Sequence, residues 1–160
     1  MSVAFTKEDS AETAAETQLP DRPISAHPNL VTAAGMKTLA RQLDQARQAY
    51  EAASLIEDVN ERRRQAAGPL RDLRYLTERL RTAQLVPAPT GDTVAFGATV
   101  TFTRDGGRRQ TYRIVGEDEA DPAAGSISYV SPIARALAGK AVGDSVTMGE
   151  QDLEIVDISQ

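Results

Sequence analysis

The chain of 160 residues contains no cysteine and no tryptophan, and its only histidine is His27. Without cysteine, disulfides, thiolate zinc sites and a cysteine nucleophile are excluded. A single histidine also speaks against a histidine-rich metal site or a Ser-His-Asp triad. With only three Phe and four Tyr, we do not expect a stacking platform for single-stranded nucleic acid.

Long apolar runs and a secretion signal are absent as well. No run approaches the ~20 apolar residues that a membrane span requires. The first residues, MSVAFTKEDSAETAAE, do not place a basic segment before an apolar one, as a secretion signal would. We therefore expect a soluble, cytoplasmic protein that does not bind membranes.

Charge is distributed unevenly along this chain, whose net charge is −5. Residues 1–32 carry two basic and five acidic side chains, residues 33–86 carry ten and seven, and residues 87–160 carry six and eleven. Binding to duplex nucleic acid needs a basic face. The acidic C-terminal segment therefore argues against nonspecific duplex binding and favours docking on a basic protein surface.

Residues 1–32 are predicted to form a flexible acidic arm, disordered or lying on the surface. Pro20, Pro23 and Pro28 interrupt any helical pattern, and the carboxylates of the segment favour solvation. Three apolar side chains are available to anchor the arm locally: Leu19, Ile24 and Leu30.

Residues 33–86 show the strongest periodicity in the chain. Apolar positions follow alternating spacings of three and four residues, which predicts helices that pack along a heptad seam. The first seam reads Met36, Leu39, Leu43, Ala46, Tyr50 and Ala53. The second reads Ala66, Leu70, Leu73, Thr77, Leu80 and Gln84, with Leu76 widening it. Two seams without a long linker favour an antiparallel helical hairpin.

The position of the hairpin turn has two candidates. Symmetry between the seams favours a tip near residues 56–61, whereas Gly68-Pro69 is a strong turn signal. Proline inside a helix removes one backbone hydrogen bond and costs ~3 kcal/mol. We therefore expect the tip near residues 56–61, with a kink or short break at Gly68-Pro69.

Residues 87–160 are predicted to form a small, mainly antiparallel β domain with one short helix, so the fold class is α+β. Ser131 and Pro132 supply an N-cap and a first helical residue. Asp105-Gly106-Gly107 predicts a turn between two strands. Runs of β-type residues occupy positions 99–103, 111–115, 127–130, 145–148 and 153–156.

Specific motifs lie within residues 96–156. They read FGATV from Phe96, YRIVG from Tyr112, DEAD from Asp118 and SYVSPIARAL from Ser128. These motifs resemble the C-terminal domain of the bacterial transcript cleavage factors, the Gre family. The resemblance extends more weakly through residues 33–86, and no motif of residues 1–31 matches the family.

The resemblance implies a fold and a partner. Gre factors have an N-terminal antiparallel coiled coil and a C-terminal domain like the FKBP prolyl isomerases. The C-terminal domain docks on RNA polymerase at the rim of the secondary channel, which the coiled coil enters. Two acidic tip residues help to hold a second Mg²⁺ for the active centre of the polymerase. We therefore expect an accessory factor that is not an enzyme, has no cofactor of its own, acts as a monomer and lies close to nascent RNA.

The resemblance also suggests the residues involved. Asp58 and Glu61 have the spacing of the acidic tip motif and are the candidate Mg²⁺ ligands. The basic run Arg62, Arg63 and Arg64 follows directly, and these residues would either contact polymerase, nucleotide or RNA, or compete with a metal as counterions. The expected docking surface comprises Asp118, Glu119, Asp121, Ser131 and Pro132. Each set also has an ordinary structural explanation, as a solvated face or as a turn and helix cap.

Other functions remain open from the sequence. The hairpin is shorter than expected for the family by about one heptad per helix, which is ~10 Å of reach. A relative that occupies the channel without stimulating cleavage, as a regulator or inhibitor, is therefore an alternative to a cleavage factor. A regulator related to those of nucleoside diphosphate kinase is another. A prolyl isomerase would need a pocket lined by aromatic residues, and the domain offers only Phe96, Phe102, Tyr112 and Tyr129.

Overall fold

The computed structural model describes residues 18–160, and the described chain forms two compact units. The first unit contains residues 18–25 and Leu39–Thr82, and the second contains Ala26–Thr38 and Ala83–Gln160. Residues 1–17 of the predicted arm lie outside the described residues. Among residues 18–160, no helix combines the length and the apolar character that a membrane span requires.

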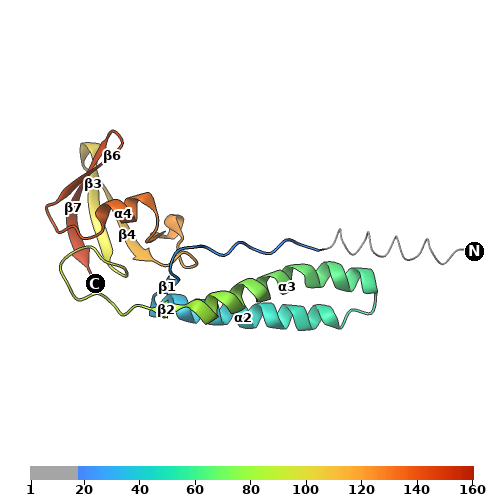
Figure 1. The fold of residues 1–160 in the computed structure, drawn as a ribbon. Helices are drawn as coiled ribbons and strands as arrows, with labels where there is room; N and C mark the ends of the chain where they lie inside the picture. Colours follow the sequence, from blue (N-terminus) through green and yellow to red (C-terminus); the bar gives the residue numbers. More distant parts are fainter. Residues whose placement is uncertain (1–17) are drawn as a thin grey trace, which may run out of the picture. The chain divides into compact units, whose positions relative to one another are not determined.

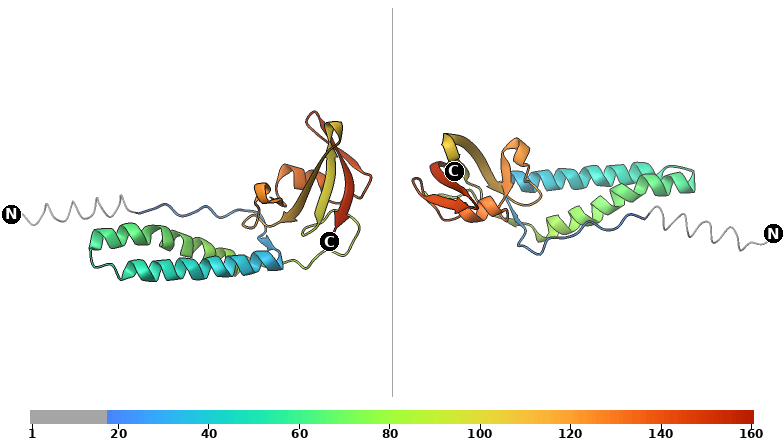
Figure 2. Two further views of the ribbon diagram at one scale, coloured as in Figure 1. Left: turned by 180° about the vertical axis from the view of Figure 1, so that it is seen from behind. Right: turned by 90° about the horizontal axis from the view of Figure 1, so that it is seen from above.

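The first unit is built on a hairpin of two long helices, α2 (Ala33–Ser54) and α3 (Val59–Thr82). Figures 1 and 2 show the two helices side by side and antiparallel. The chain turns at residues 55–58, which confirms a tip near residues 56–61 rather than at Gly68.

Helix α3 continues without interruption through Gly68 and Pro69, so of the kink or short break that we expected there, the break is wrong. Pro69 lines the same shallow depression as Ala49, Ala52 and Ala53 of α2. These alanine side chains are small, so α2 leaves space beside the proline ring. The missing N–H then costs one backbone hydrogen bond without breaking the helix.

The packing seam is confirmed for α2 and displaced for α3. Leu39, Ala46 and Ala53 are buried, as their heptad spacing predicts. In α3 the buried residues are Leu76 and Arg79, whereas the predicted seam residues Leu70 and Thr77 are exposed. Arginine can bury its aliphatic stem against apolar neighbours, and a hydrophobic pattern does not register it as a core residue.

Residues 18–25, here called the strap, lie on α3. The guanidinium group of Arg22 lies 3.8 Å from the centre of the Tyr75 ring and 3.2 Å from Asp72. Asp21 accepts a hydrogen bond of 2.8 Å from Arg74. The strap is thus held on the surface, and of the two alternatives for the arm, the structure shows the surface-bound one in this segment.

The predicted boundary at residue 32 also differs from the structure. Strand β1 (Leu30–Val31) pairs in parallel with β2 (Gln84–Leu85), and residues 26–38 belong to the second unit. The reason lies at Gly116, where a β-carbon would be 2.2 Å from the Leu30 carbonyl oxygen. Because glycine has no side chain, the backbone of β1 can approach this closely.

The second unit contains a five-stranded sheet with the strand order β5-β4-β3-β7-β6. Neighbouring strands are antiparallel except for β4 and β5, which are parallel. This largely antiparallel sheet confirms the α+β class. Its strands are β3 (Thr99–Arg104), β4 (Arg108–Val115), β5 (Ser126–Ser128), β6 (Ser145–Met148) and β7 (Gln151–Ser159).

The connections follow local sequence signals. Gly106 and Gly107 take φ values of 78° and 82° in the 3-10 turn η1 (Asp105–Gly107), which confirms the predicted turn. A second 3-10 turn, η2 (Pro122–Ala124), precedes β5. The short helix α4 (Pro132–Leu137) is capped by Ser131, whose side chain accepts a hydrogen bond from the Ala134 N–H.

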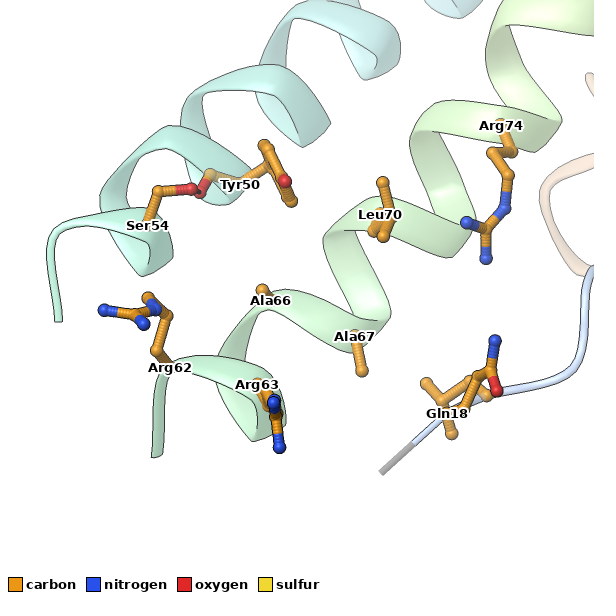
Figure 3. A pocket seen from close by; sticks show the side chains of 10 residues that line it. Gln18, Tyr50, Ser54, Arg62, Arg63, Ala66, Ala67, Leu70 and Arg74 are labelled. Atoms are coloured by element: carbon orange, nitrogen blue, oxygen red, sulfur yellow. Dashed lines mark hydrogen bonds between the residues drawn. The ribbon is translucent and has the colours of Figure 1, made fainter. Parts of the chain in front are cut away.

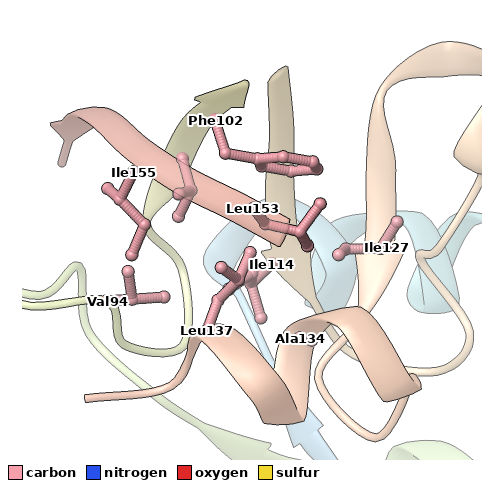
Figure 4. Close-up of a cluster of buried hydrophobic side chains, with 9 residues drawn as sticks. Val94, Phe102, Ile114, Ile127, Ala134, Leu137, Leu153 and Ile155 are labelled. Atoms are coloured by element: carbon pink, nitrogen blue, oxygen red, sulfur yellow. The ribbon is translucent and has the colours of Figure 1, made fainter. Parts of the chain in front are cut away.

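The core of the second unit lies between one face of the sheet and α4 (Figure 4). Alternate residues of the strands point to this face, as the twofold repeat of a strand requires. Ala134 and Leu137 of α4 pack against them. The buried residues of the cluster are Val94, Val100, Phe102, Ile114, Ile127, Ala134, Leu137, Leu153 and Ile155.

Candidate functional site

Asp58 caps the helix that leaves the hairpin turn. The Asp58 side chain accepts a 2.8 Å hydrogen bond from the Glu61 N–H through Oδ1, and its carbonyl accepts a 2.9 Å hydrogen bond from the Arg62 N–H. Aspartate is among the preferred N-cap residues because its side chain satisfies a free N–H of the first turn. The structure therefore gives Asp58 a clear role in folding at the tip.

Glu61 is engaged through both carboxylate oxygens. Arg64 donates to Oε2 from Nη2 at 2.7 Å and from Nε at 3.2 Å, while Gln65 donates to Oε1 at 2.8 Å. The hydrogen bond from Arg64, followed by that from Gln65, lowers the pKa of Glu61 below its ordinary value. Glu61 is therefore a charged side chain whose partners lie on its own helix.

Both tip carboxylates take part in hydrogen bonds at the start of α3. Among residues 18–160, no cluster of three or more His, Cys, Asp or Glu side chains is arranged to hold a metal ion. A hard cation requires oxygen ligands, and Mg²⁺ at Glu61 would compete with the hydrogen bonds from Arg64 and Gln65. The assignment of Asp58 and Glu61 as Mg²⁺ ligands stays a prediction.

The three arginines of the tip have different environments. Arg62 donates a 3.1 Å hydrogen bond from Nη1 to the Ile56 carbonyl, which closes the turn. Arg64 is paired with Glu61. Arg63 is exposed. The three arginines therefore differ in role: Arg62 closes the turn, Arg64 forms an ion pair, and Arg63 faces the solvent.

Glu119 lies at the first turn of α2 and is largely covered. Its Oε2 accepts a 2.6 Å hydrogen bond from the Thr32 hydroxyl, and its Oε1 lies 3.9 Å from Arg113. The Thr32 hydroxyl in turn accepts from the Gly35 N–H at 3.0 Å. With 18% of its side chain exposed, Glu119 is held within the second unit by Thr32 and Arg113, and its role in docking stays a prediction.

Two more contacts hold residues 26–38 within the second unit, and sequence reasoning missed both. A β-carbon on Gly35 would lie 2.7 Å from Glu119 Oε2, so glycine leaves the space for that carboxylate. The Tyr129 hydroxyl donates a 2.5 Å hydrogen bond to the Pro28 carbonyl. In the sequence, the only signal of such close contacts was glycine at positions 35 and 116. The structure gives neither residue a positive φ, so close packing and not backbone conformation accounts for them.

The remaining acidic loop residues and the α4 cap are more open. Asp121 is exposed, and its side chain makes no cap hydrogen bond to η2. Asp118 is half-buried. Ser131 is occupied as the cap of α4, whereas Pro132 is exposed. Of the five predicted docking residues, Asp121 and Pro132 are thus the most accessible.

The aromatic residues of the second unit are committed to packing. Phe102 is fully buried and its ring centre lies 6.1 Å from that of Tyr112. Phe96 packs edge-on against Tyr129 at 5.7 Å. The residues that a prolyl isomerase would need to line its pocket are therefore used in the core and its margins.

Comparison with known proteins identifies relatives. A family model described as the C-terminal domain of transcription elongation factor GreA/GreB matches residues 88–160. GreA of Beijerinckia indica is 38% identical over 117 residues, which cover 69% of this chain and 69% of the relative. GreA of Mesorhizobium japonicum is 41% identical over 114 residues, which cover 68% of each chain.

Other matches are shorter. GreA of Desulfovibrio desulfuricans is 42% identical over 94 residues and GreB of Neisseria meningitidis is 43% identical over 95 residues. In both cases the match spans 58% of the length of the relative.

Two solved structures are similar to this chain at a low TM-score. GreA factor homolog 1 of Thermus thermophilus is 24% identical, with a TM-score of 0.40 and coverage of 82% of this chain and 98% of the other. GreA/GreB from Nitrosomonas europaea is 17% identical, with a TM-score of 0.40 and coverage of 82% and 97%.

Proposed function

The chain belongs to the GreA/GreB family of transcription elongation factors, and on this basis we propose that it binds RNA polymerase and modulates elongation through the secondary channel. The relationship to GreA carries the proposal. A match of 117 residues is longer than residues 88–160, so it extends from the C-terminal unit into the hairpin. We assign the chain an accessory role without a catalytic centre of its own.

The C-terminal unit is the proposed docking part. Residues 87–160 carry six basic and eleven acidic residues, which favours a basic partner surface. Asp121 and Pro132 are the accessible members of the predicted docking set. Because Glu119 is occupied by Thr32, we place the contact with polymerase at Asp121 and the start of α4.

The binding test compares two charge reversals in the full-length chain. Asp121→Arg should weaken binding to purified RNA polymerase by ~1–3 kcal/mol, because it places a cation against a basic surface. Asp157→Arg changes the net charge equally at an exposed position of β7 and should leave affinity unchanged. Equal affinities for the two variants would remove the acidic loop from the docking surface.

For the tip, we propose modulation without delivery of Mg²⁺. The observation in favour is that Glu61 already binds Arg64 and Gln65 through both carboxylate oxygens. The second candidate is stimulation of transcript cleavage, which the three-residue spacing of Asp58 and Glu61 favours. The two candidates share the docking unit and differ only in the chemistry of the tip.

Transcript cleavage in stalled elongation complexes separates these candidates. Without Mg²⁺ delivery, the wild-type protein should not stimulate cleavage, yet it should compete with a cleavage-active GreA for polymerase. Robust cleavage that Asp58→Asn abolishes at unchanged polymerase affinity would establish the second candidate instead, since the amide keeps the size but loses the charge that a hard cation needs.

A further inference from the structure

A groove lies beside the strap on the first unit (Figure 3). Its volume is about 570 Å³. Helix α2 contributes Tyr50 and Ser54 to one wall, and the strap contributes Gln18 and Leu19. Helix α3 contributes an apolar floor and three arginines: Ala66, Ala67, Leu70, Arg62, Arg63 and Arg74.

The strap runs toward this groove when it is followed back toward the N-terminus. Arg22 contacts Asp72 and Tyr75, and the preceding Asp21 pairs with Arg74. Gln18 and Leu19 then reach the groove. The strap therefore runs parallel to α3, and its N-terminal end at Gln18 and Leu19 lies at the groove, on the side of the tip.

The charges of the two partners are complementary. Helix α3 carries seven arginines and three carboxylates, whereas residues 1–17 carry four carboxylates and one lysine. Arg74 and Arg64 have ion-pair partners in Asp21 and Glu61. Within residues 18–160, Arg62 and Arg63 make no salt bridge. The groove thus has unneutralised positive charge at its tip end.

We propose that the acidic segment of residues 1–17 binds in this groove and covers Arg62 and Arg63 within the same molecule. Because residues 1–17 belong to the same chain as the groove, a weak interaction is sufficient: a short covalent tether gives an effective concentration of ~mM. The bound segment shields the two guanidinium groups from other polyanions, and salt weakens the cover because its contacts are ionic. This inference does not depend on the proposed binding to polymerase.

The absence of cysteine allows a clean test by paramagnetic relaxation. A nitroxide is attached to Ser10→Cys in the full-length chain, and the broadening of backbone amide signals is measured in α3. A neutralised variant of the same labelled chain carries four further substitutions: Glu8→Gln, Asp9→Asn, Glu12→Gln and Glu16→Gln. Binding in the groove predicts strong broadening for residues 62–70 that falls several-fold in this variant and at high salt.

Two double variants test the groove side. Arg62→Gln with Arg63→Gln should reduce the broadening, whereas Arg108→Gln with Arg109→Gln, an equal change at exposed residues of β4, should not. Broadening that is insensitive to all of these changes would overturn the proposal. Broadening of an isotope-labelled chain by a spin-labelled second chain would also overturn it, because the occupant would then be another copy.

Heparin binding measures the shielding. The variant with neutral residues 8, 9, 12 and 16 should bind heparin several-fold more tightly than the wild type. A control variant neutralises four exposed carboxylates of the second unit, Asp92, Glu150, Glu154 and Asp157, and should show a much smaller gain. If both variants gained heparin affinity equally, the gain would follow net charge alone, which would contradict the proposed binding of residues 1–17 over Arg62 and Arg63.

Discussion

The two ends of α2 are built in different ways. At its first turn, Thr32 binds Glu119, which lies 87 residues away in the sequence. At its other end, the turn is closed by neighbours, as in the contacts of Asp58 with Glu61 and of Arg62 with Ile56. A substitution at the first turn therefore disturbs the packing of the second unit, whereas one at the tip disturbs a few local hydrogen bonds.

The largest loss of stability is expected at Gly116, where the backbone of β1 approaches the glycine most closely. Gly116→Ala places a β-carbon 2.2 Å from the Leu30 carbonyl oxygen, so β1 must move. Forced overlap in a packed region costs ~1–3 kcal/mol, and we expect the upper end of this range because no side chain can give way. Chemical denaturation of the full-length protein measures the loss of unfolding free energy.

Gly68→Ala is the matched control. Apart from its chain neighbours, a β-carbon at Gly68 meets no atom within 4 Å. Alanine is favoured over glycine in a helix by ~0.8–1.0 kcal/mol, but its β-carbon crowds the ring of the following Pro69, so the two effects offset each other and this variant should lose much less stability than Gly116→Ala. If Gly68→Ala lost as much stability as Gly116→Ala, close approach at Gly116 would not be the cause.

The contact between Glu119 and α2 should give the next largest effect. Glu119→Ala removes a hydrogen bond to a charged acceptor, and such bonds contribute ~1.5–3 kcal/mol. Gly35→Ala should destabilise the wild type, since the new β-carbon would lie 2.7 Å from Glu119 Oε2. In the Glu119→Ala background the same substitution should become neutral or stabilising. Thermal unfolding of the four proteins in this cycle checks the change of sign.

The β domain could be predicted from the sequence because its signals are local. The turn at Gly106 and Gly107 and the cap at Ser131 each act within a few residues, and the structure has both. The seam of α3 was misplaced at Leu70 because Leu70 lines the groove beside the strap. No periodicity in a single segment reveals such a third partner.

The candidate site was harder to predict. The DEAD motif does not show that Glu119 binds Thr32 while Asp121 remains exposed, because this depends on a contact between distant parts of the chain. At the tip, the spacing of Asp58 and Glu61 is also the spacing of an N-cap aspartate and the N–H that it accepts. One spacing thus fits two roles, and only the geometry separates them.

At the tip, the loss of the Asp58 cap should have a moderate effect. Asp58→Ala removes the acceptor of the Glu61 N–H, and loss of an N-cap costs ~0.5–2 kcal/mol. Hydrogen exchange should accelerate for the first-turn amides of α3 and remain unchanged in β3 and β7. Glu57→Ala, one residue earlier in the same turn, is the control and should have little effect. Faster exchange throughout the second unit would contradict a purely local role.

The smallest effect concerns the charge of Glu61. Hydrogen bonds from Arg64 and Gln65 lower the pKa of this carboxyl, so their stabilising contribution is present above the ordinary glutamate range and is lost as pH falls through the lowered pKa. In Arg64→Gln the Glu61 midpoint should rise toward its ordinary value, which side-chain carbon NMR can follow. Glu78, whose pKa is lowered by Arg81 three residues later in the same helix, serves as an internal control, because its midpoint should not change. If the Glu61 midpoint also stayed the same, the ion pair with Arg64 would not hold the carboxylate in solution, and Arg64 would not compete with a cation for Glu61.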